Sequence, residues 1–186
     1  MLWLVALALG LLAGILSGGR IDNFLQLRFQ WPAVVIGAVL VREAILLTPL
    51  NQVEGAQWIY AVALAVIVLW TVWHFRRLPG VWLVTAGAGL NLIVILANGA
   101  RMPVARALAG SLVARGHIGQ YTLMGTGTRL GALADWIALP WFGAAYSPGD
   151  LVVAAGLALI GFLGTRARPI STSGSGPAGL IVEHPP

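Results

Sequence analysis

The amino-acid sequence predicts an all-α membrane protein with about five transmembrane helices. Its 186 residues are 59% hydrophobic and only 9% charged, with a mean hydropathy of +0.88, whereas soluble domains carry about 25% charged residues. Several windows run for about 18 residues with almost no charge, which is the length needed to cross roughly 30 Å of hydrocarbon. We therefore expect spans at about residues 2–17, 33–50, 56–73, 81–97 and 150–164.

The charged residues argue against a nucleic-acid-binding protein. All eleven basic residues are arginine, and they stand singly or in pairs at segment ends instead of covering one soluble face. This pattern is typical of residues that set membrane topology and meet lipid headgroups. Cysteine is absent and the three histidines are far apart in the sequence, so no spaced metal motif is present. We expect no metal, no cofactor and no nucleic-acid partner.

The first predicted span lacks the positively charged start and the small-residue cleavage site of a secretory signal, so we expect it to be retained. Gly10, Gly14 and Gly18 recur at every fourth residue and form one ridge along this helix. Such a ridge lets another helix backbone approach closely. It is a candidate contact with a partner membrane protein or with a second copy of the chain.

Residues 19–31 connect the first two predicted spans. Apolar and polar side chains alternate from Leu25 to Trp31, a pattern that ordinarily indicates a strand. An isolated strand cannot satisfy its backbone at a membrane surface. We therefore expect an extended or helical interfacial connector, with Trp31 as its anchor.

Polar residues also occur inside the predicted spans. Arg42 and Glu43 lie in the second span, where a charge at the bilayer centre costs about 3 kcal/mol on insertion scales. Both should therefore face protein or a wet cavity. In the fourth span, Asn91 and Asn98 are seven residues apart and share a helix face. We expect Asn91 to face Arg42 or Glu43, which would form a mid-membrane polar cluster.

A long, partly polar segment separates the fourth and fifth predicted spans. Residues 103–115 begin with a proline and carry a narrow apolar stripe, which predicts an interfacial helix. Residues 129–140 are too short to cross but too apolar for open water, which predicts a re-entrant or interfacial segment. Ser147-Pro-Gly-Asp150 is a helix-start signal in which Asp150 is placed to cap the fifth span or to lie in its first turn.

The chain is predicted to form one integral membrane domain, residues 1–165. Residues 166–186 are rich in serine and glycine and have too little apolar surface to fold, so we expect a disordered tail. The shortest arginine-bearing loops belong in the cytoplasm by the positive-inside rule. This places the N-terminus outside and the C-terminus in the cytoplasm.

Three stretches of the sequence point to a known family. They are Arg28-Phe-Gln-Trp31-Pro32, the Asn91–Val104 stretch with its Asn-Gly-x-x-Met-Pro-Val turn, and Leu133–Pro140 followed by the Ser-x-Gly-Asp helix start. Together they resemble a family of small bacterial integral membrane proteins known only as a domain of unknown function. The resemblance extends to about Gly164.

The resemblance implies a multi-pass protein of the bacterial inner (cell) membrane, and it supplies no activity. The sequence departs from the family pattern at Ala100, where a second glycine is expected. The Arg42–Glu43 pair has no place in that pattern, which indicates a feature particular to this chain.

Under the predicted topology, five polar residues lie near the outer membrane face and form a candidate site: Asn98, Arg101, Arg129, Asp135 and Asp150. Carboxyl groups can act as general acid and base, and an arginine can hold a phosphate or carboxylate. The structural alternative is that Asn98 and Asp150 cap helices and that Asp135 pairs with an arginine. We expect Arg101 to face the segment that carries Asp135.

Three function classes remain open. The first, which we favour, is a binding or accessory protein whose outer segment forms a groove for a partner subunit or an amphiphilic ligand. The second is a small enzyme that acts on a lipid-linked substrate; its missing nucleophile and metal cluster argue against it. The third is a carrier or channel that uses the mid-membrane polar residues; it lacks the internal repeat that common transporters show.

Overall fold

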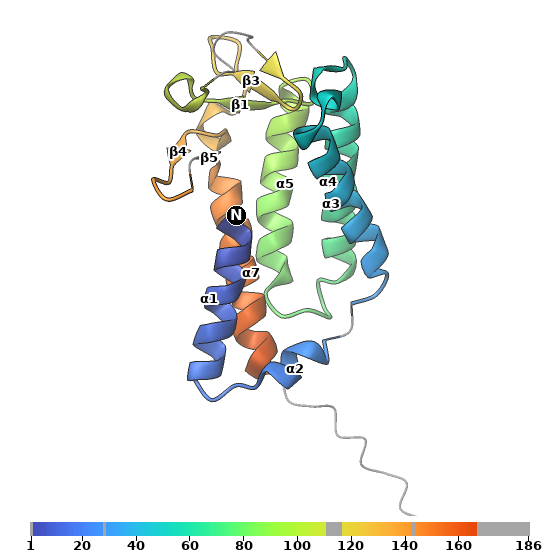
Figure 1. The fold of residues 1–186 in the computed structure, drawn as a ribbon, viewed down its shortest axis with the longest axis vertical. Coiled ribbons are helices and arrows are strands. Elements are labelled where there is room, and N and C mark those ends of the chain that lie inside the picture. The colour runs from blue at the N-terminus through green and yellow to red at the C-terminus, as the bar shows by residue number, and fades with distance from the viewer. Residues whose placement is uncertain (1, 28, 111–116, 143, 167–186) are drawn as a thin grey trace, which may run out of the picture.

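The computed structural model describes residues 2–27, 29–110, 117–142 and 144–166. These residues form a bundle of long helices with a cap of short strands at one end (Figure 1). The α-helices are α1 (Leu2–Leu16), α2 (Ile21–Leu25), α3 (Pro32–Leu47), α4 (Ala56–Trp73), α5 (Val81–Ala97) and α7 (Pro148–Arg166). Each apolar segment predicted as a span is therefore a helix, close to its predicted bounds. The predicted tail after residue 166 lies outside the described residues.

Length and composition make two of these helices candidate membrane spans. α4 has 18 residues and α7 has 19, and both are apolar enough to cross a bilayer. α1 and α5 are apolar but shorter, with 15 and 17 residues. α3 has 16 residues and carries the charges of Arg42 and Glu43. The prediction of five spans is thus not supported by helix length, because an untilted span takes about 20 residues.

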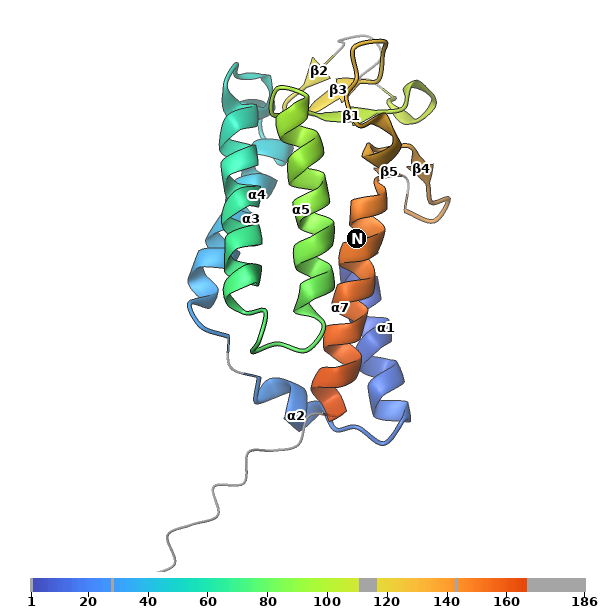
Figure 2. The same cartoon turned by 180° about the vertical axis from the view of Figure 1, so that it is seen from behind.

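The long helices follow one another across the bundle in the order α1, α7, α5, α4 and α3, as Figures 1 and 2 show from opposite sides. α7 is packed against both α1 and α5. Small residues allow this, because they let helix backbones approach closely. A Cβ on Gly10 would lie 2.0 Å from the Ala158 carbonyl oxygen, and one on Gly161 would lie 2.9 Å from the Leu7 oxygen.

The predicted glycine ridge on α1 is therefore used within the chain. Gly10 and Gly14 both face α7; a Cβ on Gly14 would lie 2.0 Å from the hydroxyl oxygen of Thr165. Gly18 lies beyond the end of α1 with φ +87° and has no atom within 4 Å of its would-be Cβ. Because α7 already covers Gly10 and Gly14, this ridge is not an open face for another copy or a partner helix.

Glycines also bring α7 into backbone contact with α5. A Cβ on Gly87 would lie 2.4 Å from the Gly149 carbonyl oxygen, and one on Gly156 would lie 2.6 Å from the Val84 nitrogen. Both distances are shorter than any Cβ contact allows. The first turn of α7 and the middle of α5 are consequently held at a fixed separation, which positions the polar groups described below.

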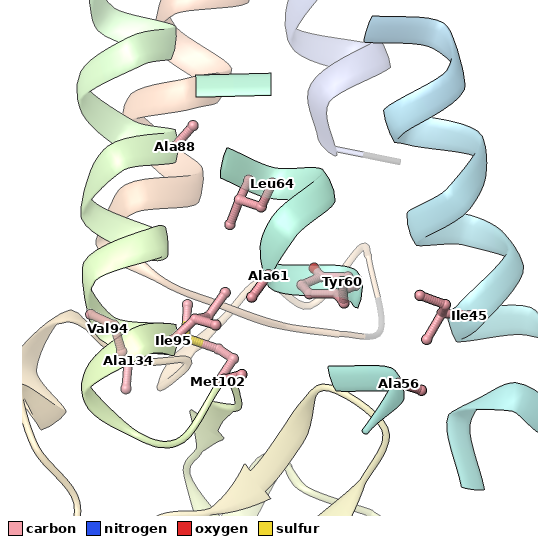
Figure 3. Close-up of a cluster of buried hydrophobic side chains, with 11 residues drawn as sticks. Ile45, Ala56, Tyr60, Ala61, Leu64, Ala88, Val94, Ile95, Met102 and Ala134 are labelled. Atoms are coloured by element: carbon pink, nitrogen blue, oxygen red, sulfur yellow. The ribbon is translucent and has the colours of Figure 1, made fainter. Parts of the chain in front are cut away.

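A buried apolar cluster joins the cap to the bundle. Ile45 of α3, Tyr60 of α4 and Ile95 of α5 pack in one cluster with Met102 and Ala134 of the cap, as Figure 3 shows. Each of these side chains is at most 7% exposed. Burial of a large apolar side chain contributes about 1.5–3 kcal/mol, so the cap is anchored to the helices by hydrophobic packing.

The described residues of the cap form five short strands and single turns of 3₁₀ helix. Strands β1, β3 and β2 form one sheet in that order, with β1 and β3 parallel and β2 and β3 antiparallel. β4 and β5 form a separate antiparallel pair. The strands are β1 (Met102–Val104), β2 (His117–Ile118), β3 (Tyr121–Leu123), β4 (Ile137–Ala138) and β5 (Ala145–Tyr146), and the 3₁₀ turns are η1 (Pro49–Gln52), η2 (Arg106–Leu108) and η3 (Gly131–Leu133).

The predicted interfacial helix over residues 103–115 is wrong. Pro103 lies in the middle of β1, opposite Thr122. The missing N–H of proline breaks no strand hydrogen bond at this position. The Met102 nitrogen and the Val104 oxygen form the hydrogen bonds on the edge of β1 that faces β3. Pro103 uses only its carbonyl oxygen, on the opposite edge. The chain continues as the single turn η2, and residues 111–116 lie outside the described residues.

The segment predicted to be re-entrant or interfacial, residues 129–140, lies in the cap as η3 followed by β4. Its backbone is satisfied by β1: the Asp135 nitrogen donates to the Pro103 oxygen at 2.9 Å, and the Ala105 nitrogen donates to the Asp135 oxygen at 2.8 Å. Pairing with a distant strand thus satisfies the backbone of this segment.

At the opposite end of the bundle, the predicted connector is partly helical, because it contains α2. Gln30 attaches the last residues of this connector to α4 and the turn after it. The Gln30 nitrogen donates to Nε2 of the fully buried His74 at 3.0 Å, and Nδ1 of His74 lies 2.8 Å from the Trp70 carbonyl oxygen. The side-chain oxygen of Gln30 accepts from Trp73 and Arg77. Because both ring nitrogens of His74 are engaged, this histidine has a structural role.

Replacement of Ala100 by glycine is expected to stabilise the protein by about 1 kcal/mol, because φ > 0 is strained for any residue with a Cβ. Ala100 is fully buried with φ +63°, directly after Gly99 with φ +69°. This is the position where the family resemblance led us to expect a glycine. The free energy of unfolding in detergent micelles measures the effect.

Ala134→Gly is the matched control, because Ala134 is equally buried but has φ −80°. That change should destabilise the protein, because glycine raises the conformational entropy of the unfolded chain and relieves no backbone strain in the folded one. Equal losses of stability in the two variants would show that the Ala100 conformation is not strained.

Candidate binding site in the cap

Asp135 is the most deeply placed acidic side chain of the cap. The backbone of Asp135 forms a β-bridge with Val104. The two backbone hydrogen bonds of Asp135 described above flank this bridge. The side chain is 5% exposed, and its Oδ1 atom has no hydrogen-bond partner among the residues that the structure describes. A buried polar atom of this kind costs about 1–3 kcal/mol unless a partner supplies the missing bond. Asp135 is therefore a candidate ligand-binding group.

A cavity of about 240 Å³ adjoins this carboxyl group. Apart from Asp135 and Tyr121, its lining is apolar: Val104, Leu108, Ala109, Ile118, Ala144 and Ala145. The cavity brings together β1, η2, β2, β3 and the start of β5, which are distant in the sequence. Its chemistry is that of an apolar pocket with one carboxyl group and one phenol.

Burial, together with the smaller effect of the nearby charge of Asp150, raises the pKa of Asp135 to about 8. Burial also raises the pKa of Tyr121 above its ordinary value. At pH 7 Tyr121 is therefore neutral, and the protonated form of Asp135 predominates. A neutral carboxyl group can donate one hydrogen bond and accept others, so the cavity presents a donor and acceptor without a net charge.

Asp150, the second carboxyl group of the predicted site, is engaged in capping α7. Its Oδ2 accepts from the Ser147 nitrogen at 3.0 Å, and the Ser147 hydroxyl accepts from the Asp150 nitrogen at 3.0 Å. These reciprocal bonds form a capping box. Asn91 of α5 closes the arrangement: it donates to Asp150 Oδ1 at 2.9 Å and accepts from the Ser147 hydroxyl at 2.8 Å.

The predicted mid-membrane cluster does not form. Asn91 faces α7 instead of Arg42 or Glu43. Arg42 donates to the Tyr60 hydroxyl and lies over the Tyr60 ring, with the guanidinium carbon 4.6 Å from the ring centroid. The physical reason is the helix order: α5 lies between α7 and α4, so a residue on its α7 face points away from α3.

Asn98 and Arg129 are brought together, but only Asn98 acts through its side chain. The Asn98 amide donates to the Val94 oxygen at 2.8 Å, at the end of α5, and to the Arg129 carbonyl oxygen at 2.9 Å. The Asn98 oxygen accepts from the Arg129 nitrogen at 2.9 Å. Asn98 therefore closes the helix and holds the cap backbone, while the Arg129 side chain is exposed.

Arg101 does not face the cavity of Asp135, contrary to our expectation. Its Nε donates to the Gly119 carbonyl oxygen at 3.3 Å, and the side chain lines a different cavity beside Asn51 and Glu54. Asn51, Glu54 and Tyr121 were missed as site residues by sequence reasoning, because each stands in a turn or short strand with no motif around it.

These features define a mostly helical protein with two candidate membrane-spanning helices and a strand-built cap that encloses a buried carboxyl group. The chain belongs to a family of unknown function, DUF5317, whose model matches residues 26–162. The matched range contains Asn98, Asp135 and Asp150. No curated protein and no solved structure matches the chain.

Proposed function

We propose that this chain is a multi-pass protein of the cell membrane that binds the uncharged polar end of an amphiphile in its cap. The observation that supports this most strongly is Asp135, a buried carboxyl group with an unpartnered oxygen beside an apolar cavity.

The outward faces of the long helices support a bilayer location for the whole bundle. Each carries large apolar side chains that are more than a third exposed, such as Leu9, Leu40, Val62, Ile93 and Leu151. Soluble monomers rarely expose contiguous apolar patches beyond a few hundred Å². The shorter helices can be accommodated by local thinning of the bilayer.

We place the cap outside and the C-terminus in the cytoplasm of a bacterial cell. Arg20, Arg76, Arg77 and Arg166 lie at or beyond helix ends opposite the cap, where the positive-inside rule favours them. The cap then meets the outer headgroup region, from which an amphiphile can enter.

The cavity favours the end of a ligand with an apolar body. Its volume of about 240 Å³ is smaller than the roughly 300–1,000 Å³ of sites that enclose a whole drug-sized ligand. A hydroxyl or amide group can exchange hydrogen bonds with a neutral carboxyl group, while the apolar lining covers the neighbouring carbons. A long-chain alcohol satisfies both conditions.

Binding is favoured over the enzyme and carrier hypotheses. An acid–base pair would need Asp150 as well as Asp135, but Asp150 is engaged in capping. A carrier route would need Arg42 and Asn91 together, but they bond to different helices.

A photoreactive octanol is expected to label the lining of this cavity when the full chain is held in lipid nanodiscs. Above pH 8 the half-saturating concentration should rise about tenfold per pH unit, because ionisation of Asp135 removes its donor hydrogen. Asp135→Asn should keep the labelling and lose the pH dependence, since an amide is a neutral donor and acceptor. Mapping the labelled peptides by mass spectrometry checks the site.

Asp135→Leu should abolish saturable labelling, because it removes both hydrogen-bonding functions. Asp22→Asn, at an exposed side chain of α2, is the matched control and should behave like the wild type. Labelling that is unchanged in Asp135→Leu would refute this function.

A further inference from the structure

A second cavity, of about 640 Å³, lies between the start of α4 and the turn that joins β2 to β3. Gly119 in that turn has φ +53°, and a Cβ there would lie 3.1 Å from the Cβ of Asn51. This close approach of two loops forms one wall. The other lining is largely polar, in contrast to the cavity of Asp135, and includes Glu54, Gln57 and Arg101.

Opposite charges line this cavity without pairing. Arg101 bonds through Nε to the Gly119 carbonyl oxygen, which fixes the guanidinium and leaves its two terminal nitrogens without a hydrogen bond among the described residues. Glu54 is exposed at the rim. In the described part of the chain, the ion pair within 4.0 Å is Arg20–Asp22. Arg101 and Glu54 are therefore available to bind the two charges of one ligand.

Two carboxamides add a donor and an acceptor between these charges. Oδ1 of Asn51 is shielded from solvent and has no partner within the described ranges, while its amide nitrogen donates to the Leu46 oxygen at 3.2 Å. The Gln57 oxygen accepts from the Gly55 nitrogen at 3.0 Å, which leaves the Gln57 amide hydrogens for a ligand. The Asn51 oxygen is thus a buried acceptor next to the cavity whose hydrogen bond is not filled by any described residue.

We infer that this cavity binds a zwitterion of the phosphoethanolamine class. Its phosphate would accept hydrogen bonds from the Arg101 terminal nitrogens and from the Gln57 amide, because arginine presents a fork that suits phosphate oxygens. Its ammonium would donate to the Glu54 carboxyl group, which lines the same cavity. The group could come from a lipid headgroup or from a soluble ester, and it does not depend on the Asp135 cavity.

The test titrates the full chain, purified in a neutral detergent, with phosphoethanolamine and with inorganic phosphate by calorimetry. Phosphoethanolamine should bind at least about tenfold more tightly, because its ammonium adds a charge-assisted hydrogen bond that inorganic phosphate cannot make. Glu54→Gln should remove this preference and leave phosphate binding unchanged. Arg101→Gln should weaken both ligands by about tenfold or more.

Arg129→Gln is the matched control, because Arg129 is an exposed arginine of the same cap that does not line the cavity. It should bind both ligands as the wild type does. The inference is overturned if the wild type shows no preference for phosphoethanolamine, or if Glu54→Gln retains that preference. Glu54 is exposed, so its replacement leaves the fold intact.

Nanodiscs then distinguish the two sources of the group. If a lipid headgroup is the occupant, phosphatidylethanolamine discs should block binding of soluble phosphoethanolamine, whereas phosphatidylcholine discs should not, because a quaternary ammonium has no hydrogen to donate. Equal binding in both discs would assign the site to a soluble ester.

Discussion

Between pH 5 and pH 7, the wild-type protein is expected to lose about 1.4 kcal/mol of unfolding free energy per pH unit relative to Asp135→Asn. The pKa of Asp135 is about 8 in the folded chain and 3.8 in its ordinary state. The folded state therefore holds a proton that the unfolded state has released, and a rise in pH favours unfolding. The stabilisation that protonated Asp135 gives the folded state is fully present below about pH 4, and it is lost as the pH rises through 8.

Equilibrium unfolding in mixed detergent micelles at a series of pH values measures this difference. Asp22→Asn, at an exposed aspartate paired with Arg20, is the control for removing a carboxyl group outside the cap. If the wild type and Asp135→Asn run parallel, the carboxyl group is ionised at neutral pH and the proposed neutral site does not exist.

Gly149→Ala is expected to destabilise the protein by about 3 kcal/mol or more, because it combines overpacking with lost hydrogen bonds. A Cβ on Gly149 would lie 2.0 Å from the side-chain oxygen of Asn91 and 2.8 Å from the Gly87 carbonyl oxygen. Asn91 would have to move, and its bonds to Ser147 and Asp150 would be lost with it. The free energy of unfolding and the fraction of folded protein after purification report the effect.

Gly37→Ala on α3 is the control for the added methyl group. No atom lies within 4 Å of the Cβ that would be added there, so the higher helix propensity of alanine should leave stability unchanged or raised by up to about 1 kcal/mol. Asn91→Ala should also destabilise the protein by itself. The double variant with Gly149→Ala should lose less stability than the sum of the two single losses, because both changes disrupt the same contact. Similar stabilities for Gly149→Ala and Gly37→Ala would contradict the described packing of α5 on α7.

The helices could be predicted from the sequence because their signal is local. Residues 56–73 and 81–97 are continuous apolar runs between clear turns, and the structure begins and ends α4 and α5 at these positions. The Ser-Pro-Gly-Asp start of α7 was likewise correct, since a capping box depends on residues three positions apart. Whether all the long helices cross a membrane stays a prediction.

The cap could not be predicted because its contacts are distant in the sequence. Pro103 and the apolar residues after it have the spacing of a helix, yet β1 pairs with β3 about twenty residues later and with Asp135 beyond that. Neither partner has a local signal that points to the other. The sequence identified Asp135 as a candidate but paired it with an arginine, whereas the structure leaves its Oδ1 unpartnered.

The position of Asn91 shows a further limit. Its helix face follows from the sequence, since residues seven apart share a face. Which neighbour covers that face depends on the order of the helices, and this order is set by glycine contacts such as Gly87 against Gly149. The expected partners on α3 were therefore wrong, although the expectation that Asn91 faces the bundle interior was confirmed.

Infrared spectroscopy of the Asp135 carboxyl group tests the central claim most directly. The difference spectrum between the wild type and Asp135→Asn at pH 7 is predicted to contain the carbonyl band of a protonated carboxyl group, and this band should shift when octanol is added. A difference spectrum that shows only an ionised carboxylate, unchanged by octanol, would contradict the assignment of Asp135 as a neutral ligand-binding group.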